Sequence, residues 1–332
     1  MILADMGADI LRIDRAGSPS ANTPTNRGRT AIELDLKSSE GQDTARSLIS
    51  NADVLLEGMR PGALERLGLA PELCLKVNPA LVIGRMTGWG QTGPLSMRAG
   101  HDINYIALTG VLHAIGGEAP VPPLNLVGDY GGGGAYLLIG VLSAVIRARL
   151  SGKGSVVDAA MVDGAASLMT LAYERMKEGR WLDERCSNAL DGGTPWYSVY
   201  KTRDDRYMAV GCNEPAFYKI FIETLGLQLD QTPERSDRTN WPALRTLFAS
   251  HFAQRTREEW TAIFEHTDAC VSPVLSMKEA PHHPHNAARS TFRDVDGHPI
   301  PGPAPRFGEG VAPLAATSTQ LSVNAALARW KR

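Results

Sequence analysis

The segments Asp53-Val-Leu-Leu-Glu57 and Ala80-Leu-Val-Ile-Gly-Arg-Met86 decide the fold of this chain. Each is a short apolar run of the length and composition that are typical of a buried strand. Helix-like stretches that begin at Pro61 and Pro71 separate the two runs. Strands that alternate with helices in this way favour a parallel sheet whose connections are right-handed crossovers.

The N-terminal residues extend this alternation. Residues 10–14 and 31–36 read as strands, and a helix-like stretch follows them. Ser38 or Ser39 caps this helix, and Ser39 with Gln42 fits a capping box. Residues 1–8 read as a helix, whereas an open parallel sheet normally begins with a strand. We therefore expect the leading strand of the fold to be missing, and the alternative is a short N-terminal helix packed on the sheet.

The chain changes character at the Gly- and Pro-rich passage Asp191-Gly-Gly-Thr-Pro-Trp-Tyr197. Before it we predict a helix, a strand and a helix at 135–150, 155–161 and 163–178. After it we predict two paired strands at 197–201 and 206–211, and then three helices at 214–225, 241–253 and 257–266. A loop-like stretch begins at residue 281, and a last helix follows at 322–330. We therefore expect a large parallel-sheet domain over residues 1–165, followed by a linker helix over 166–195. A small α+β domain would cover 196–285, and residues 286–332 would return to the large domain.

The bulk composition excludes several classes of protein. The 332 residues are 43% hydrophobic and 21% charged with a formal net charge of −2, which is ordinary for a soluble protein and predicts no nucleic-acid partner. The four cysteines form no C-x-x-C pair, so we expect reduced thiols, no metal site and a cytoplasmic setting. The longest apolar run, residues 135–146, is shorter than the roughly 20 residues that span a bilayer, so no membrane partner is predicted.

Two ionisable residues stand out by their positions. His101 and Asp129 each lie just before a stretch that reads as a helix. A helix start presents unpaired N–H groups and a partial positive charge. One site could thus hold two proton-transfer groups and an amide donor for an oxyanion, the parts needed to remove and return a proton beside a carbonyl. Taken alone, His101 also fits a structural histidine and Asp129 a helix N-cap.

Other motifs also allow two interpretations. The run Gly131–Gly134 lacks the pattern of a dinucleotide-binding loop, and we expect its glycines to let a ligand approach the backbone. His113 reads as a structural histidine on the same helix as His101. The cluster His282-His-Pro-His285 suggests a metal, but its Pro-rich context favours a surface loop.

Several cations lie at or just after the predicted strand ends: Arg15, Lys37, Arg60, Arg66 and Arg85. In a wound sheet the carboxyl ends of the strands line the ligand crevice. These residues are therefore candidates for a polyphosphate site, and solvated surface charges are the alternative.

Seven motifs, in this order and spacing, resemble the α-methylacyl-CoA racemases of the class III CoA-transferase family: Arg12-Ile-Asp-Arg15, Asp35-Leu-Lys-Ser38, Glu57-Gly-Met-Arg-Pro-Gly62, Arg85-Met-Thr-Gly-Trp-Gly-Gln-Thr-Gly-Pro94, Gly100-His-Asp-Ile-Asn-Tyr105, Gly128-Asp-Tyr-Gly-Gly-Gly133 and Gly154–Asp163. The resemblance covers essentially the whole chain. It implies an interlocked homodimer in which each chain has a large Rossmann-like domain containing both termini and a small α+β domain. The active site would lie between the large domain of one subunit and the small domain of the other.

The resemblance also implies roles for single residues. His101 and Asp129 would be the catalytic pair, Glu214 would polarise the histidine, and Asn125 would lie beside the aspartate. From residue type alone, Glu214 reads as a first-turn helix acid and Asn125 as a turn residue. Contacts with the phosphates and adenine of CoA would fall near Arg15, Lys37, Arg60 and Arg66.

The implied activity is interconversion of (R)- and (S)-2-methylacyl-CoA by 1,1-proton transfer through an enolate. CoA would be part of the substrate, and no separate cofactor is expected. His101 and Asp129 would act on opposite faces of the α-carbon, with the main-chain N–H of Asp102 as the donor to the thioester oxygen. Two alternatives stay open: CoA transfer with Asp129 as the nucleophile, and a non-catalytic acyl-CoA-binding protein.

Overall fold

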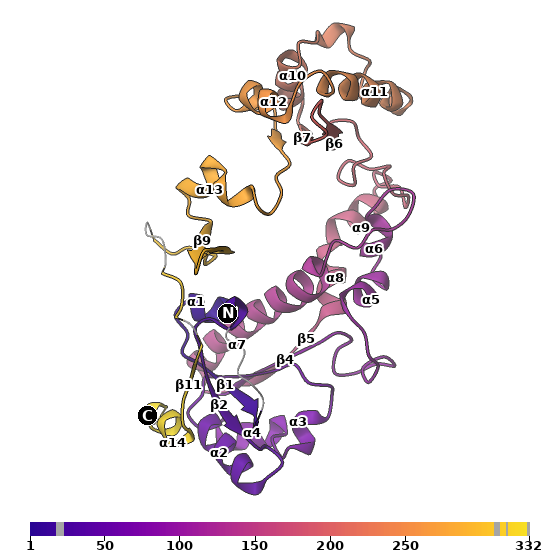
Figure 1. Cartoon of the computed structure of the whole chain (residues 1–332). Helices are drawn as coiled ribbons and strands as arrows, with labels where there is room; N and C mark the ends of the chain where they lie inside the picture. Colours follow the sequence, from indigo (N-terminus) through magenta and orange to yellow (C-terminus); the bar gives the residue numbers. More distant parts are fainter. Residues whose placement is uncertain (18–22, 309–312, 317, 331–332) are drawn as a thin grey trace. The chain divides into compact units, whose positions relative to one another are not determined.

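The computed structural model describes residues 1–17, 23–308, 313–316 and 318–330 (Figure 1). It divides the chain into two compact units. The first, here the large unit, comprises Met1–Leu108, Asn125–Leu168 and Glu279–Arg332, and the second, the small unit, comprises Thr109–Leu124 and Met169–Lys278. The expected linker helix and small domain, residues 166–195 and 196–285, therefore fall mostly within one unit.

Parallel strands organise the large unit, as predicted. One sheet has the order β1-β2-β11, formed by Ile10–Arg15, Arg29–Leu34 and Thr319–Gln320. The other has the order β3-β4-β5, formed by Val54–Glu57, Val82–Thr87 and Ser155–Ala160. Because all these neighbours are parallel, the carboxyl ends of paired strands lie at the same edge of each sheet.

Apart from the return segment at residues 280–301, the helices of the large unit are α1 (Ile2–Asp5), α2 (Ser39–Ile49), α3 (Ala63–Arg66), α4 (Pro71–Val77), α5 (Asp102–Ala107), the π-helix η2 (Leu126–Ala135), α7 (Tyr136–Ser151), α8 (Met161–Leu168) and α14 (Val323–Arg329). A short 3₁₀ turn, η1, covers Pro24–Asn26. Helix α2 contributes to the cores of both sheets, because Leu48 packs with Ile32 of β2 while Ile49 packs with Ile83 of β4. Helix α14 lies beside β2, in yellow in Figure 1.

The start of α2 decides between the two predicted caps. Ser38, not Ser39, is the N-cap, and its hydroxyl accepts a hydrogen bond from the Gly41 N–H at 3.0 Å. Gly41 is required there, since a Cβ would lie 2.1 Å from the Asp35 carbonyl oxygen. The predicted Ser39–Gln42 capping box is therefore wrong, although the helix that it predicted is present.

Helix α1 precedes the first strand. Its Asp5 forms a buried ion pair with Arg27 at 2.6 Å, and its Ala4 packs against Gly28, just before β2. The short N-terminal helix that was the alternative interpretation is thus present. The missing leading strand stays a prediction.

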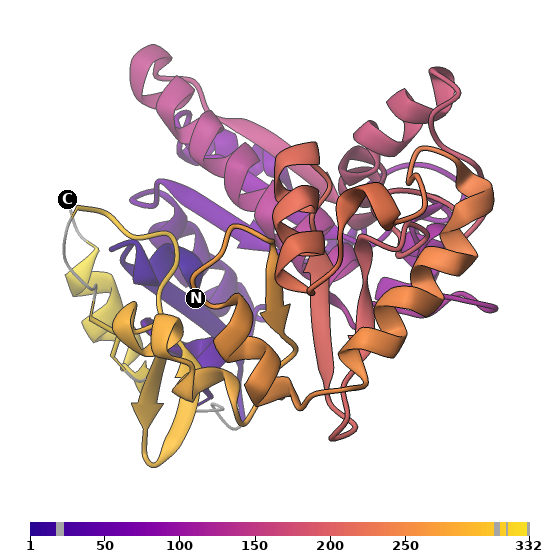
Figure 2. The same ribbon diagram turned by 90° about the horizontal axis from the view of Figure 1, so that it is seen from above.

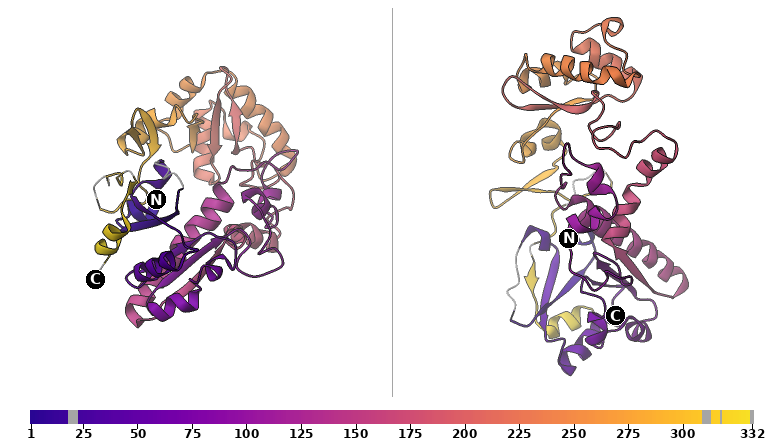
Figure 3. Two further views of the ribbon diagram at one scale, coloured as in Figure 1. Left: turned by 60° about the horizontal axis from the view of Figure 1, so that its bottom comes forward. Right: turned by 90° about the vertical axis from the view of Figure 1, so that its right-hand side faces the viewer.

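Helices η2 and α7 run on from each other over Leu126–Ser151, a stretch longer than the predicted apolar run. By length and composition alone this helix could cross a membrane, a test that core helices of soluble proteins also meet. One face packs on β4 and β5, where Val141 and Ala148 are buried. Figures 2 and 3 show the ribbon of this helix, in magenta, from two further directions. The other face leaves Ile146 and Leu150 largely exposed.

The return segment contains more regular structure than predicted. It forms a 3₁₀ turn, a helix and an antiparallel hairpin: η5 (Ala280–His282), α13 (Pro284–Ala288), β9 (Phe292–Val295) and β10 (His298–Pro301). The hairpin turns at Asp296-Gly297, and both residues have positive φ. Asp-Gly is a strong signal for a hairpin turn, so the loop expected from residue 281 is wrong at this point.

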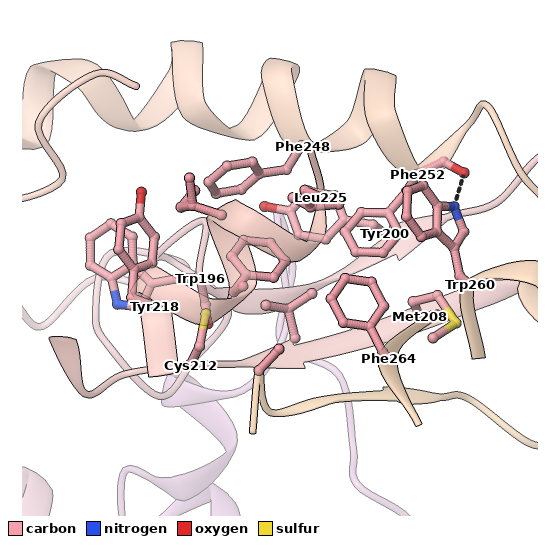
Figure 4. Close-up of a cluster of buried hydrophobic side chains, with 14 of the residues drawn as sticks. Trp196, Tyr200, Met208, Cys212, Tyr218, Leu225, Phe248, Phe252, Trp260 and Phe264 are labelled. Carbon is pink, nitrogen blue, oxygen red and sulfur yellow. Dashed lines mark hydrogen bonds between the residues drawn. The ribbon is translucent and has the colours of Figure 1, made fainter. Parts of the chain in front are cut away.

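The small unit is an antiparallel sheet covered by helices. Strands β6 (Tyr197–Lys201), β7 (Tyr207–Gly211) and β8 (Val271–Pro273) pair in that order, which confirms the predicted β6–β7 pair. Its helices are α6 (Val111–Ala114), α9 (Thr170–Lys177), α10 (Pro215–Thr224), η3 (Leu229–Gln231), η4 (Arg238–Asn240), α11 (Trp241–Phe252) and α12 (Arg257–Phe264). Figure 4 shows its aromatic core, in which the Trp260 indole N–H donates to the Phe252 carbonyl at 2.9 Å.

Candidate active site

The loop that follows β4 brings His101 into position. Gly88 and Gly100 leave room for the ring of Tyr105, which would lie 2.0 and 2.8 Å from a Cβ at these two positions. Tyr105 also meets Trp89 edge to face, with ring centroids 4.8 Å apart. The Tyr105 hydroxyl donates to the carbonyl of Gly100, the residue before His101. The buried tyrosine therefore fixes the backbone from which the histidine projects.

His101 is the N-cap of α5, as predicted. Its φ of −132° is extended, and its N–H donates to the Asn104 side-chain oxygen at 3.0 Å. The residue is exposed, so its imidazole is accessible to a ligand. His113 does not continue this helix, because α5 ends at Ala107 and α6 begins after Gly110 with a φ of 80°. The prediction that the two histidines share a helix is wrong.

Asp102 links the starts of the two helices. Its side chain is buried, with only 5% of the residue exposed, and Oδ2 accepts a hydrogen bond from the Asp129 N–H at 2.8 Å. As the first residue of α5, Asp102 has a main-chain N–H that no helical carbonyl can accept. One residue thus offers an amide donor at the helix start and a carboxylate that holds the neighbouring helix.

Asp129 lies inside a helix rather than just before one. The π-helix η2 begins at Leu126, so Asp129 falls near its start and Asn125 is the N-cap. The amide of Asn125 donates to Asp129 Oδ2 at 3.1 Å, which places these two predicted site residues together. Because Asp102 follows His101 and bonds to Asp129, the predicted catalytic pair is joined through one residue and one hydrogen bond.

The glycines after Asp129 pack the protein against itself. A Cβ on Gly132 would lie 2.5 Å from the Ala165 nitrogen, and a Cβ on Gly164 would lie 1.9 Å from the Gly132 carbonyl oxygen. These positions allow η2 and α8 to approach closely. The prediction that the glycines of Gly131–Gly134 leave space for a ligand is therefore wrong at Gly132, where α8 fills that space.

The carboxylates affect the tyrosine that they surround. Burial, together with the negative charges of Asp129 and Asp102, raises the pKa of Tyr105. The phenol therefore stays neutral at physiological pH and keeps its hydrogen bond to the carbonyl before His101. Tyr105 was not singled out from the sequence, although it lies four residues after His101, one helical turn on.

Most of the predicted cations are exposed at strand ends. Arg15 ends β1, and Lys37 and Arg60 follow the ends of β2 and β3. All three are exposed, and none forms an ion pair with another residue in the part of the chain that the structure describes. Arg66, at the end of α3, is also exposed. These side chains remain available for an anionic ligand.

Arg85 has a different environment. Only 6% of it is exposed, and its guanidinium contacts Glu57 at 2.6 Å and Glu65 at 2.8 Å. The hydrogen bond from Arg85 lowers the pKa of Glu65. Two carboxylates occupy this guanidinium, so the geometry favours a structural role for Arg85 over a direct contact with a phosphate.

Glu214 belongs to the small unit. It is the N-cap of α10, it is exposed, and Pro215 follows it at the first helical position. The buried Cys212 lies two residues before it and directly follows β7. An exposed carboxylate at a helix start is available to a partner, and its pairing with His101 stays a prediction.

The small unit also contains a cavity of about 290 Å³. Its lining includes Met169, Met176 and Trp181, with His113 and Asp183 at a polar side. The His113 Nε2 lies 3.4 Å from the Asp183 carboxylate. His113 is therefore held within the small unit, as expected for a structural histidine. Among the described residues, no group of three or more His, Cys, Asp or Glu side chains has the arrangement of a metal site.

Fold and site together define an α/β protein with a histidine, an aspartate and a main-chain donor at adjoining helix starts. The same unit carries exposed cations at the ends of its parallel strands. The chain belongs to CoA-transferase family III, whose family model matches residues 1–325.

Individual relatives agree with this assignment. The alpha-methylacyl-CoA racemase of Mus musculus is 46% identical over 307 residues, which are 92% of this chain and 80% of the relative. The alpha-methylacyl-CoA racemase of Homo sapiens is 44% identical over 308 residues, 91% of this chain and 81% of the relative. The crystal structure of a CAIB/BAIF family protein from Brucella suis has a TM-score of 0.79 and 24% identity, covering 99% of this chain and 93% of that one, and supports the fold.

Proposed function

We propose that this chain is a racemase that interconverts (R)- and (S)-2-methylacyl-CoA thioesters. The single observation that carries the proposal is the hydrogen bond from the Asp129 N–H to Asp102, because it holds a carboxylate close to the start of the helix that carries His101. The names of the mouse and human relatives support the same chemistry. CoA is then part of the substrate, and no separate cofactor is proposed.

The mechanism uses two proton-transfer residues and one main-chain donor. In one direction His101 takes the proton from C2, and the electron pair of the C–H bond moves onto the thioester oxygen to give an enolate. The Asp129 carboxyl group then delivers a proton to the opposite face of C2, and the carbonyl reforms. In the other direction the two roles are exchanged. Microscopic reversibility requires this symmetry of a racemase.

The enolate oxygen needs donors that are already in place. The main-chain N–H of Asp102 begins α5 and lies beside His101, so it is the proposed donor. One such donor is typically worth about 3 kcal/mol in the transition state. Asn125 holds the Asp129 carboxylate by its hydrogen bond at 3.1 Å and so orients the second proton-transfer group.

We propose that the CoA part of the substrate binds at the exposed cations Arg15, Lys37, Arg60 and Arg66. Three of them follow the carboxyl ends of parallel strands, where α/β proteins place their ligands. Arg85 would support this edge from within by its ion pairs to Glu57 and Glu65.

We propose further that the active protein is a homodimer in which Glu214 orients His101 of the partner subunit. The exposed apolar side chains of α7, including Ile146 and Leu150, give the large unit a surface that a second copy would cover. Mixing His101→Ala subunits with Glu214→Gln subunits should restore activity that neither variant has alone. Failure of this complementation, with intact mixed dimers, would show that Glu214 does not serve His101 of the partner subunit.

The test of the activity is incubation of each enantiomer of a 2-methylacyl-CoA in D₂O without an acceptor acid. The wild type should incorporate deuterium at C2 and produce the other enantiomer. His101→Ala and Asp129→Ala should each lose inversion, by roughly 10²–10⁴-fold, because each removes one proton-transfer group. Tight binding of the thioester with no deuterium incorporation would contradict the proposal and favour an acyl-CoA-binding protein.

CoA transfer is the second candidate, and the family to which the chain belongs favours it. There Asp129 would attack the thioester carbonyl, form an acyl anhydride and release CoA as its thiolate. An acceptor carboxylate would replace the donor acid in this anhydride, and the CoA thiolate would then attack the acceptor carbonyl, forming the new thioester and freeing Asp129. His101 would have no proton to take from C2. Turnover that requires an acceptor acid and leaves C2 unlabelled would therefore support transfer instead of racemisation.

A further inference from the structure

We propose that the carboxylate of Asp102 is a positioning residue that holds Asp129 at the place required for inversion. This inference rests on the proposed racemase function and extends it to a side chain that does not itself transfer a proton. Asp102 Oδ2 accepts a hydrogen bond from the Asp129 N–H at 2.8 Å, and Asp102 directly follows His101 in the chain. A single buried carboxylate thus sets the spacing between the two proton-transfer residues.

The geometry of η2 explains why this hydrogen bond is needed. In an α-helix the Asp129 N–H would donate to the carbonyl of Asn125, four residues earlier. In the π-helix Tyr130 takes that acceptor instead, at 3.4 Å. The Asp129 N–H therefore has no acceptor within its own helix, and Asp102 supplies one from α5.

The space between α5 and η2 is adapted to this contact. A Cβ on Gly128 would lie 2.6 Å from Asp102 Oδ2 and 3.3 Å from the Asp102 Cα. Only glycine at position 128 lets the two helices come this close. Gly128 therefore allows the Asp102 carboxylate to reach the N–H of Asp129.

Burial of the Asp102 carboxylate lowers the stability of the fold. Its Oδ1 atom is buried and has no hydrogen-bond partner among the described residues. A buried acceptor without a donor destabilises a fold, and such groups persist where function requires them. Holding Asp129 is a function that a single carboxylate oxygen can perform.

The test separates the side chain of Asp102 from its main chain. Asp102→Ala keeps the main-chain N–H proposed for the enolate oxygen and removes only the carboxylate. Asp102→Asn keeps an oxygen that can accept the Asp129 N–H. Gly128→Ala pushes η2 away from the other side, and Gly134→Ala is the matched control, since its nearest contact would be at an ordinary 3.6 Å.

The readout is the ratio of inversion to deuterium exchange without inversion, measured on each enantiomer in D₂O. When Asp129 is displaced, His101 can still remove and return a proton on its own face. Asp102→Ala and Gly128→Ala should therefore lower inversion by roughly 100-fold, the usual cost of a displacement of about 1 Å, and lower His101-dependent exchange much less. Asp102→Asn should recover much of the inversion that Asp102→Ala loses, because it keeps an acceptor for the Asp129 N–H. Gly134→Ala should stay close to the wild type.

The outcomes distinguish the inference from the function beneath it. Equal losses of inversion and exchange would indicate a merely structural role for Asp102 and overturn the inference. So would an unchanged ratio in both Asp102→Ala and Gly128→Ala. A wild type that shows no exchange at C2 would overturn the proposed function and, with it, the role that rests on it.

Discussion

The two units of this chain are built on different principles. The small unit has one continuous core of aromatic and aliphatic side chains, drawn in part in Figure 4. The large unit has separate smaller clusters, two of which share α2, and its longest helix leaves an apolar face exposed. The candidate proton-transfer residues lie in the large unit, where glycines allow close contacts, as Gly88 does with the Tyr105 ring, and where Arg27 and Arg85 form buried ion pairs.

This difference shows how a site can be held in place. A core of large side chains resists unfolding but is tolerant of small shifts in backbone position. Contacts at Gly88, Gly128 and Gly132 tolerate almost no shift, because one added carbon atom would meet another residue at 2.6 Å or less. We therefore expect substitutions in the core of the small unit to affect stability. Substitutions of these glycines in the large unit should affect catalysis.

The largest expected effect on stability comes from Phe221→Ala in the small unit. Phe221 is fully buried and packs edge to face on Phe248, with centroids 5.0 Å apart. Its truncation should lower the free energy of unfolding by about 4 kcal/mol, as is usual for a buried phenylalanine. Urea unfolding followed by tryptophan fluorescence measures it, and Phe221→Leu is the milder control. A loss below about 1 kcal/mol would contradict the view of this core as the principal stabilising element.

A smaller loss is expected from Arg85→Met in the large unit. The substitution leaves the Glu57 carboxylate, 4% exposed, without its partner at 2.6 Å. Breaking a buried pair from one side costs about 3 kcal/mol. The double variant Arg85→Met with Glu57→Gln should recover part of this loss, since it removes the stranded charge. If the double variant is no better than the single one, the ion pair is not the source of the effect.

The arrangement of strands and helices could be predicted from the sequence because it depends on local patterns. Strand β4 follows from its apolar run, and α10 follows from the amphipathic pattern of residues 214–225. Helix ends were predicted less precisely, because the sequence left Ser38 and Ser39 as alternative caps and only Ser38 caps α2. The hairpin β9–β10 was missed because neighbouring prolines obscured the Asp296-Gly297 turn.

The candidate site was only partly accessible to sequence reasoning. His101 as an N-cap could be predicted from its position alone. The π-helix η2 could not, because its register depends on the contacts of Gly128 and Gly132 with segments distant in sequence. For the same reason the sequence indicated neither the bond between Asp102 and Asp129 nor the ion pairs that occupy Arg85.

Equivalent helix caps in the two units provide a direct comparison. Ser38 caps α2 of the large unit and accepts from Gly41 at 3.0 Å, while Thr256 caps α12 of the small unit and accepts from Glu259 at 3.2 Å. Each replacement by alanine should lower the free energy of unfolding by about 1 kcal/mol. Thermal unfolding of the two variants measures the losses side by side. A much larger loss for Ser38→Ala would show that α2, which supports both sheets, is the weaker point of the chain.

The smallest effect at neutral pH, and the clearest difference between the units, concerns ionisation. Burial raises the pKa of Tyr218 in the small unit to about 12. Because the folded value lies above the unfolded value of 10, its contribution is complete below pH 10 and is lost as the pH rises through 12. In the large unit the hydrogen bond from Arg85 lowers the pKa of Glu65. The contribution of Glu65 to the stability of the fold is therefore present above the ordinary glutamate pKa and is lost in acid.

Tyr218→Phe tests the alkaline half of this contrast. The Tyr218 hydroxyl is buried with no hydrogen-bond partner among the described residues, and the Arg235 guanidinium lies over the ring, 4.3 Å from its centroid. Phenylalanine keeps the ring and this cation–π contact, so stability at pH 7 should change by less than about 1 kcal/mol or increase. The variant should also resist unfolding between pH 10 and 12 better than the wild type, as urea titrations at each pH measure. Identical alkaline profiles would mean that other buried groups, such as Tyr200, govern the small unit at high pH, since burial raises their pKa as well.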